Sequence, residues 1–190
     1  MMLDGILPFA RTLLEKVVHH GDIAIDCTAG NGHDTLFLAK RVGENGHVYS
    51  FDIQQTAIEK TSYRISEQAL QHRVTLLHGS HEKVAECIPI EQHGKIKGAI
   101  FNLGYLPGGA KDIVTTPTST ISAIEQLIEM LDVGGIIVLV IYHGHEQGKI
   151  EKDAVLSFVE QLAQEKAHVL KYEFINQRNN PPFIVAIEKR

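Results

Sequence analysis

Short apolar runs alternate with longer segments of helical spacing along the whole chain, and this alternation limits the fold more than any other feature. Strands that alternate with helices form βαβ units, in which the strands lie parallel and the helices cover both faces of one sheet. The sequence therefore predicts an α/β fold with a mainly parallel sheet. The seven expected strands cover residues 23–27, 47–52, 74–78, 96–103, 135–142, 168–174 and 183–188.

The last two expected strands differ from the others because only a short polar segment separates them, and no helix fits there. They are expected to pair as an antiparallel hairpin, whereas a six-stranded dinucleotide-binding sheet ends on a parallel strand. The expected helices show apolar residues on one face. They comprise an early helix through Ile6, Phe9, Leu13 and Val17, helices at 32–40 and 55–70, one capped within 118–122 and ending near Leu131, and one through Val155, Phe158, Val159 and Leu162.

Composition narrows the class of protein. The chain has 190 residues, of which 44% are hydrophobic and 22% charged, so a single globular domain over residues 1–190 is expected. No apolar run approaches the roughly 18 residues that span a bilayer, and no signal peptide is expected. With two cysteines, neither a disulfide scaffold nor a metal cluster is expected, and the cytoplasm is the predicted location.

The loop after the first expected strand, residues 26–35, reads DCTAGNGHDT and leads into a helix. Glycines permit positive φ angles and close approach of a ligand, and a helix start offers free N–H groups. Thr35 replaces the third glycine of the dinucleotide fingerprint, which favours a ligand without phosphates. The cofactor-binding candidates of this loop are Thr28, Gly30, Asn31, Gly32, Asp34 and Thr35.

Polar residues also follow the second and third expected strands. Asp52 can accept hydrogen bonds from two ribose hydroxyls, and Gln54 lies next to it. Ser80 and His81 can contact an adenine edge. Ordinary turn chemistry explains any one of these sites, but three such sites at three successive strand ends favour binding of a nucleoside-like cofactor.

Five segments resemble class I S-adenosylmethionine-dependent methyltransferases, and more closely a small bacterial family known under the label "rRNA methylase". They are residues 26–35, 48–54 (VYSFDIQ), 101–109 (FNLGYLPGG), 142–145 (YHGH) and 180–183 (NPPF). The resemblance implies a Rossmann-like sheet of seven strands with an antiparallel last strand. It also implies S-adenosylmethionine as cofactor and S-adenosylhomocysteine as product. The implied reaction is methylation, at the wobble position (34) of tRNA, of the exocyclic amine of 5-aminomethyl-2-thiouridine to give 5-methylaminomethyl-2-thiouridine.

Asn102 ends the fourth expected strand, where many amino-methyltransferases carry Asn/Asp-Pro-Pro-Tyr/Phe. This chain has Asn-Leu-Gly-Tyr at residues 102–105, so the first and last positions match and the two prolines are absent. We expect the Asn102 carbonyl to orient the acceptor amine and Tyr105 to pack against the uracil. The structural alternative is that Asn102 caps the loop and Tyr105 packs in its wall.

Two further polar segments are predicted to reach the substrate. Tyr142 and His143, after the fifth expected strand, are catalytic candidates because an imidazole can take up the amine proton. His145, Ser119 and Thr120 are substrate-binding candidates, although hydroxyl side chains at 115–120 also suit helix capping. No metal site is expected, since His143 and His145 lack a third ligand at a recognisable spacing.

The net charge of the chain does not identify its binding partner. The chain has 18 Lys+Arg against 23 Asp+Glu and lacks the basic excess typical of RNA-binding proteins. Either a homodimer joins two modest basic patches across one anticodon arm, or recognition is local to an unstacked base. The competing functions are methylation of rRNA or of a small-molecule amine, a non-catalytic adenosylmethionine-binding module, and a nicotinamide dehydrogenase.

Overall fold

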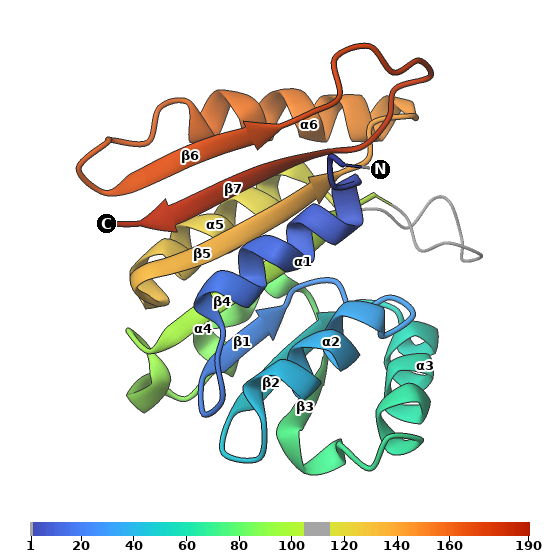
Figure 1. Ribbon diagram of the computed structural model, residues 1–190, viewed down its shortest axis with the longest axis vertical. Helices are drawn as coiled ribbons and strands as arrows, with labels where there is room; N and C mark the ends of the chain where they lie inside the picture. The colour runs from blue at the N-terminus through green and yellow to red at the C-terminus, as the bar shows by residue number, and fades with distance from the viewer. Residues whose placement is uncertain (1, 105–114) are drawn as a thin grey trace.

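Strands and helices alternate in the computed structural model as the sequence predicts, and the model describes residues 2–104 and 115–190 (Figure 1). The helices are α1 (Ile6–Val17), α2 (His33–Val42), α3 (Gln55–Ser66), α4 (Val84–Cys87), α5 (Pro117–Met130) and α6 (Glu146–Val159), with 3-10 turns η1 (Gln71–Arg73), η2 (His81–Lys83) and η3 (Ile90–Gln92). The strands are β1 (Ile23–Asp26), β2 (His47–Asp52), β3 (Val74–His78), β4 (Ile96–Leu103), β5 (Leu131–Ile141), β6 (Ala167–Tyr172) and β7 (Phe183–Lys189).

One seven-stranded sheet carries the fold, with strand order β3-β2-β1-β4-β5-β7-β6. β1 to β5 pair in parallel, while β7 runs antiparallel to both β5 and β6. The predicted α/β class and the antiparallel final pair are therefore confirmed. The order reverses direction between β1 and β4, so the carboxyl ends of these two strands border the crevice in which open α/β sheets bind ligands.

Two hydrophobic clusters bury the two faces of the sheet. α1, α2 and α3 pack on one face, where Leu14 and Leu38 meet Ile100 and Val138. α4, α5 and α6 pack on the other, where Ile124 and Val155 join the core. Figure 1 shows α1 lying across β4 and β5.

Several predicted boundaries are wrong by a few residues. α3 ends at Ser66 rather than Leu70, and Ala69 then adopts a φ of 54°. α5 is capped by Thr116 and not within 118–122, because Pro117 suits the first helical position and the Thr116 hydroxyl accepts from the Ser119 N–H. β5 begins at Leu131 rather than at 135, since Leu131 pairs with Ile96 before a register shift.

Candidate active site

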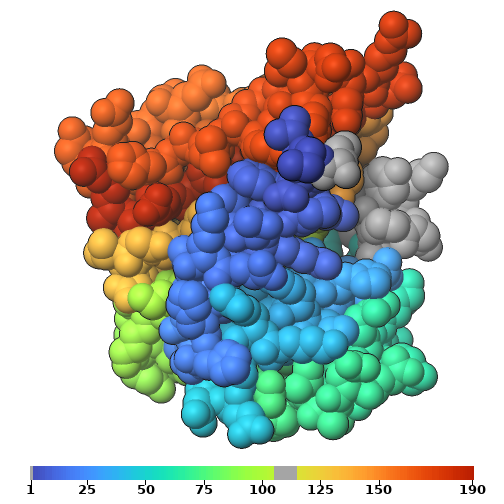
Figure 2. All heavy atoms as spheres, viewed as in Figure 1, coloured from blue at the N-terminus to red at the C-terminus, as the bar shows by residue number. Residues whose placement is uncertain are grey.

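A cavity of about 920 Å³ lies at the carboxyl ends of β1, β4 and β5. Its volume falls within the usual range for small-molecule sites. Figure 2 shows the molecular surface hollowed between α1 and α2. The cavity is lined by Leu7, Arg11, Thr28, Ala29, Gly30, Asn31, His33, Asp34, Asn102, Gly104, Tyr142, His143, Gly144, His145 and Asn180.

The loop between β1 and α2 forms one wall of the cavity, and α3 supports it from behind. Gly32 has a φ of 77°, and a Cβ there would lie 2.9 Å from the Cα of Thr61. Only glycine fits such a left-handed position this close to a neighbouring backbone. The loop is therefore held tightly against α3.

Asp52, at the end of β2, is tied to this loop. Its Oδ2 accepts from the Gly30 N–H at 2.9 Å, and its Oδ1 accepts from the Gln54 N–H at 2.9 Å. A carboxylate offers about four acceptor positions, so two remain for ribose hydroxyls. Neither Asp52 nor Gln54 lines the 920 Å³ cavity. Gln54 is the residue that precedes α3, so the two residues lie on the α3 side.

His81, after β3, was predicted to contact an adenine, but it is buried and does not line the 920 Å³ cavity. Its Nδ1 lies 2.9 Å from the Cys27 carbonyl oxygen, which can only accept, so Nδ1 carries the proton. Burial lowers the pKa of His81 and keeps the ring neutral. Nε2 is then a buried acceptor with no partner among the described residues. Ser80 instead caps the following turn, where its hydroxyl accepts from the Glu82 N–H.

Thr35, predicted to contact the cofactor, lies outside the reach of a ligand. Its side chain is fully buried, and Oγ1 donates to the Asp26 Oδ2 at 2.6 Å. Its oxygen also accepts from the Ser50 hydroxyl, at 2.8 Å. Burial is the main cause that raises the pKa of Asp26 to about 7. Thr35 therefore stabilises the base of the loop instead of binding a cofactor.

The acceptor side of the cavity is built around Asn102. Its backbone N–H donates to the Thr28 Oγ1 at 2.8 Å, and its side-chain Nδ2 donates to the Asp34 Oδ2 at 2.9 Å. Arg11 holds the other oxygen of Asp34, with Nη2 at 2.9 Å and Nε at 3.2 Å. Because a carboxylate accepts and cannot donate, the amide nitrogen must face Asp34, which leaves the carbonyl oxygen of Asn102 to accept from a ligand.

Tyr142, His143 and His145 line the cavity opposite the β1–α2 loop. Burial, together with the charge of Asp34, raises the pKa of Tyr142, so its hydroxyl stays protonated. Burial lowers the pKa of His143, whose ring packs edge-on against Phe183 at 5.4 Å. The Nδ1 of His145 accepts from the Gly148 N–H at 3.1 Å and thereby caps α6. A neutral imidazole and a neutral phenol thus share the cavity with the Asp34 carboxylate.

The hydroxyl residues predicted to bind substrate have other partners. Ser119 forms part of the α5 cap with Thr116. Thr120 is fully buried, and its hydroxyl donates to Glu151 at 2.7 Å, which places it in the interior and away from a substrate. Tyr105, predicted to pack on the uracil, lies outside the described residues.

Three features of this region were not predicted from the sequence. Leu7 and Arg11 line the cavity because α1 crosses β4 and β5, and no local pattern signals that packing. Glu151 is a buried carboxylate that accepts from the hydroxyls of Thr115 and Thr120. Glu151 precedes Val155 by four residues and Val159 by eight, so helical spacing places it on the core face of α6. A charged residue on a core face was the feature of the sequence that could have revealed this buried carboxylate.

Over residues 2–104 and 115–190, no three His, Cys, Asp or Glu side chains gather in a group that could hold a metal ion. Within the same ranges no helix combines the length and the apolar character needed to cross a membrane.

Comparisons with known proteins agree with this geometry. The "Putative rRNA methylase" family model matches residues 48–188. A chloroplastic tRNA (mnm(5)s(2)U34)-methyltransferase of Arabidopsis thaliana is 38% identical over 190 residues, covering 95% of this chain and 68% of that protein. A "putative rRNA-methylase" structure from Clostridium thermocellum is 42% identical, with a TM-score of 0.96 and full coverage of both chains. A "putative methyltransferase" of Streptococcus mutans in complex with SAH is 37% identical, with a TM-score of 0.90 and full coverage of both.

With this fold and these relatives, the protein is an S-adenosylmethionine-dependent methyltransferase, as the resemblance implied. Within that class, the chain belongs to the "Putative rRNA methylase" family. The glycine loop and the free acceptor positions on Asp52 suit the amino acid and ribose parts of the cofactor.

Proposed function

We propose that the protein methylates the exocyclic amine of 5-aminomethyl-2-thiouridine at wobble position 34 of tRNA, giving 5-methylaminomethyl-2-thiouridine. Two findings support this substrate over ribosomal RNA, despite the family label. The Arabidopsis relative, 38% identical, carries that tRNA in its name. The acceptor side of the cavity also offers hydrogen-bond acceptors and neutral polar groups, which suit an alkylamine.

The observation that carries the proposal is the Asn102–Asp34 hydrogen bond at the cavity wall. It turns the Asn102 carbonyl oxygen toward the ligand space, where it can accept an N–H of the amine. An amine held in this way directs its lone pair away from Asn102 and can be aligned for in-line attack. Positioning of this kind supplies several kcal/mol of barrier reduction.

The cofactor supplies an electrophilic methyl group on a sulfonium. The amine nitrogen forms a bond to that carbon as the carbon–sulfur bond breaks, and the sulfur keeps the electron pair. The nitrogen becomes a secondary ammonium and then releases one proton. In our proposal His143 takes up a proton directly or through water, because its lowered pKa keeps the ring neutral.

The amine must also be unprotonated before it attacks, since an alkylammonium has no lone pair. A cation close to the neutral amine disfavours its protonation, and so does partial desolvation. Tyr142, whose phenol stays protonated, can donate to a uracil oxygen or accept an N–H of the amine. The proposed catalytic set is thus Asn102, Tyr142 and His143, with His145 at the substrate side.

The same proposal assigns the cofactor contacts. Thr28, Gly30, Asn31, Gly32 and Asp34 hold the amino acid part, and Asp52 with Gln54 holds the ribose. Ser80 and His81 stay predictions of the sequence for the adenine. The homodimer and the cytoplasmic location stay predictions of the sequence.

Mass spectrometry of tRNA nucleosides tests the substrate. A strain lacking the gene is expected to accumulate 5-aminomethyl-2-thiouridine and to lose its methylated form, and the purified protein with S-adenosylmethionine should restore it in vitro. An unchanged nucleoside profile, together with methylation of a small amine, would favour the metabolite enzyme. Cofactor binding without methylation of any RNA from that strain would favour the non-catalytic module.

A further inference from the structure

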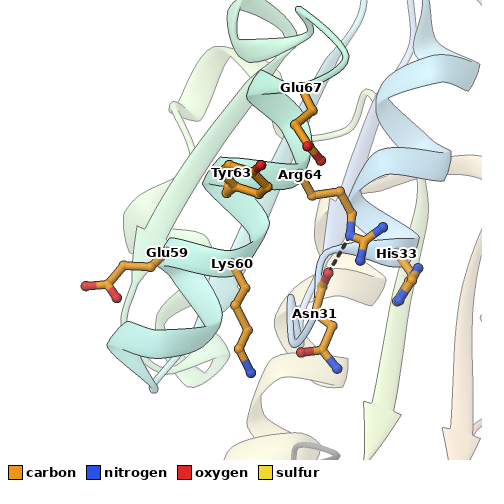
Figure 3. Close-up of a pocket in the computed structure, with 7 residues that line it drawn as sticks. All are labelled: Asn31, His33, Glu59, Lys60, Tyr63, Arg64 and Glu67. Atoms are coloured by element: carbon orange, nitrogen blue, oxygen red, sulfur yellow. Dashed lines mark hydrogen bonds between the residues drawn. The ribbon is translucent and has the colours of Figure 1, made fainter.

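A second hollow of about 520 Å³ opens beside the active-site cavity, between α3 and the loop that precedes α2 (Figure 3). Asn31 and His33 line both hollows, so the two lie on either side of this loop. The remaining lining residues all come from α3 and the residue that follows it: Glu59, Lys60, Tyr63, Arg64 and Glu67. We call this hollow the α3 groove.

Two cations of the α3 groove extend toward the active site. Lys60 and Arg64 are four residues apart and so lie on one face of α3. In Figure 3 both side chains extend from the helix toward Asn31 and His33. Arg64 is fixed there, because its Nε donates to the Asn31 carbonyl oxygen at 2.7 Å. That bond leaves the terminal nitrogens of the guanidinium available to a ligand.

These cations have no acidic partner in the described part of the chain: no carboxylate there lies within 4.0 Å of the side-chain nitrogens of Lys60 or Arg64. Figure 3 shows Glu59 on the far side of α3, pointing away from Asn31 and His33. In the same view Glu67 lies at the end of the α3 groove that is farther from Asn31. Positive charge therefore concentrates on the side of the α3 groove that faces the active site.

The helix that carries the two cations is packed closely against the cofactor loop. Thr61 lies between them in sequence and is buried against Gly32, where a Cβ on the glycine would come within 2.9 Å of the Thr61 Cα. The same helix face thus fixes both the cofactor loop and the two cations. A ligand group bound by Lys60 and Arg64 would therefore lie at a defined distance from the active site. A substrate longer than one nucleotide can make a second contact of this kind.

We propose that the α3 groove binds a backbone phosphate of the RNA strand next to the nucleotide that enters the active site. A guanidinium with free terminal N–H groups and a nearby ammonium suit a phosphate, whose oxygens accept several charge-assisted hydrogen bonds. Tyr63, 66% exposed at the groove, offers a ring on which a neighbouring base can stack. The inference rests on the proposed tRNA substrate, and it supplies the local positive charge that the overall composition lacks.

Lys60→Gln tests the α3 groove, because Lys60 is exposed and holds no other part of the fold. Lys60→Arg keeps the charge, and Lys40→Gln, on the exposed side of α2, is the matched control. The substrate is tRNA purified from a strain that lacks the gene. Steady-state methylation gives KM and kcat, and filter binding at several salt concentrations gives the salt dependence of affinity.

For Lys60→Gln we expect KM for tRNA to rise about fivefold with kcat within twofold. Loss of one phosphate contact should also reduce the slope of log affinity against log salt by about 0.7. Lys60→Arg should restore both values, Lys40→Gln should leave both unchanged, and the thermal midpoint and the affinity for S-adenosylhomocysteine should stay the same in all variants.

Two results would overturn the inference while the proposed function stands. In the first, Lys60→Gln has the wild-type KM and salt slope. In the second, Lys40→Gln raises KM as much as Lys60→Gln does, which would show a general effect of charge. If the wild-type protein methylates no tRNA from the deletion strain, the proposed function fails, and the α3 groove proposal fails with it.

Discussion

The side-chain amide of Asn102 donates to the Oδ2 of Asp34 at 2.9 Å, across 68 positions of sequence. Asp34 lies in the first turn of α2 and Asn102 near the end of β4. Arg11 of α1 holds the other oxygen of Asp34. One carboxylate therefore joins the cofactor loop, the acceptor strand and the N-terminal helix, so donor and acceptor are positioned by a single hydrogen-bonded unit.

Asn102→Ala removes the carbonyl oxygen that faces the ligand. We expect kcat to fall about 100-fold, in the range seen when one oriented polar group is removed from an active site. The affinity for S-adenosylhomocysteine should stay within about threefold, because the loop contacts of the cofactor remain. Methylation assays and calorimetry measure the two quantities. Turnover near the wild-type rate with cofactor affinity intact would remove Asn102 from the mechanism.

Much of this architecture could be predicted from the sequence, because β2, β3 and β4 are short apolar runs whose bounds follow from composition. Side-chain partners could not. The pattern placed Thr35 at the cofactor, but its hydroxyl turns inward to Asp26. It placed Thr120 at the substrate, but the Thr120 hydroxyl donates a hydrogen bond to the Glu151 carboxylate of α6. A serine or threonine hydroxyl can cap a helix, bond to a buried polar group or contact a ligand. Which of these it does depends on the packing of elements that are distant in the sequence.

Gly32→Ala tests the contact between the cofactor loop and α3. Left-handed backbone costs a residue with a Cβ about 1–2 kcal/mol, and the added methyl group would also meet the Thr61 backbone at 2.9 Å. We expect a loss of at least about 2 kcal/mol of stability, together with weaker cofactor binding. Gly79→Ala is the control, since nothing lies within 4 Å of a Cβ there. Urea unfolding of both variants checks this, and equal stabilities would show that the loop yields easily.

Asp26→Asn addresses the pH dependence of stability. Burial raises the pKa of Asp26 from its usual 3.8 to about 7, so between these two pH values the native state holds a proton that the unfolded state has released. Stability contributed by this group is full below pH 3.8 and falls until about pH 7, by roughly 4 kcal/mol in total. Asparagine does not ionise and avoids this loss.

The difference in unfolding free energy between wild type and Asp26→Asn should therefore shift in favour of the variant as pH rises from 4 to 7. Comparing the two proteins cancels the titration of every other group. Urea unfolding at pH 4.5, 6 and 8 measures the shift. A difference that stays constant over this range would mean that Asp26 is already ionised in the folded protein.

Glu151 supports the wall of the cavity from the interior. Its Oε2 accepts from the Thr115 hydroxyl at 2.5 Å, and the oxygen of that hydroxyl accepts from the Gly104 N–H at 3.0 Å. Gly104 lines the cavity next to Asn102. Burial raises the pKa of Glu151, while both threonine hydroxyls act to lower it. A buried carboxylate is thus linked through Thr115 to the residue that follows β4 at the acceptor wall.

Glu151→Ala leaves the buried Thr120 hydroxyl and the Thr115 hydroxyl without their acceptor, and we expect a loss of about 3 kcal/mol of stability. Glu151→Gln retains one acceptor and should lose less than half of that. Because Gly104 is released in the alanine variant, KM for tRNA should rise while the affinity for S-adenosylhomocysteine changes little. The exposed Glu125→Ala on α5 is the matched control. If Glu151→Ala and Glu125→Ala unfold at the same urea concentration, the hydroxyl–carboxylate cluster does not stabilise this wall.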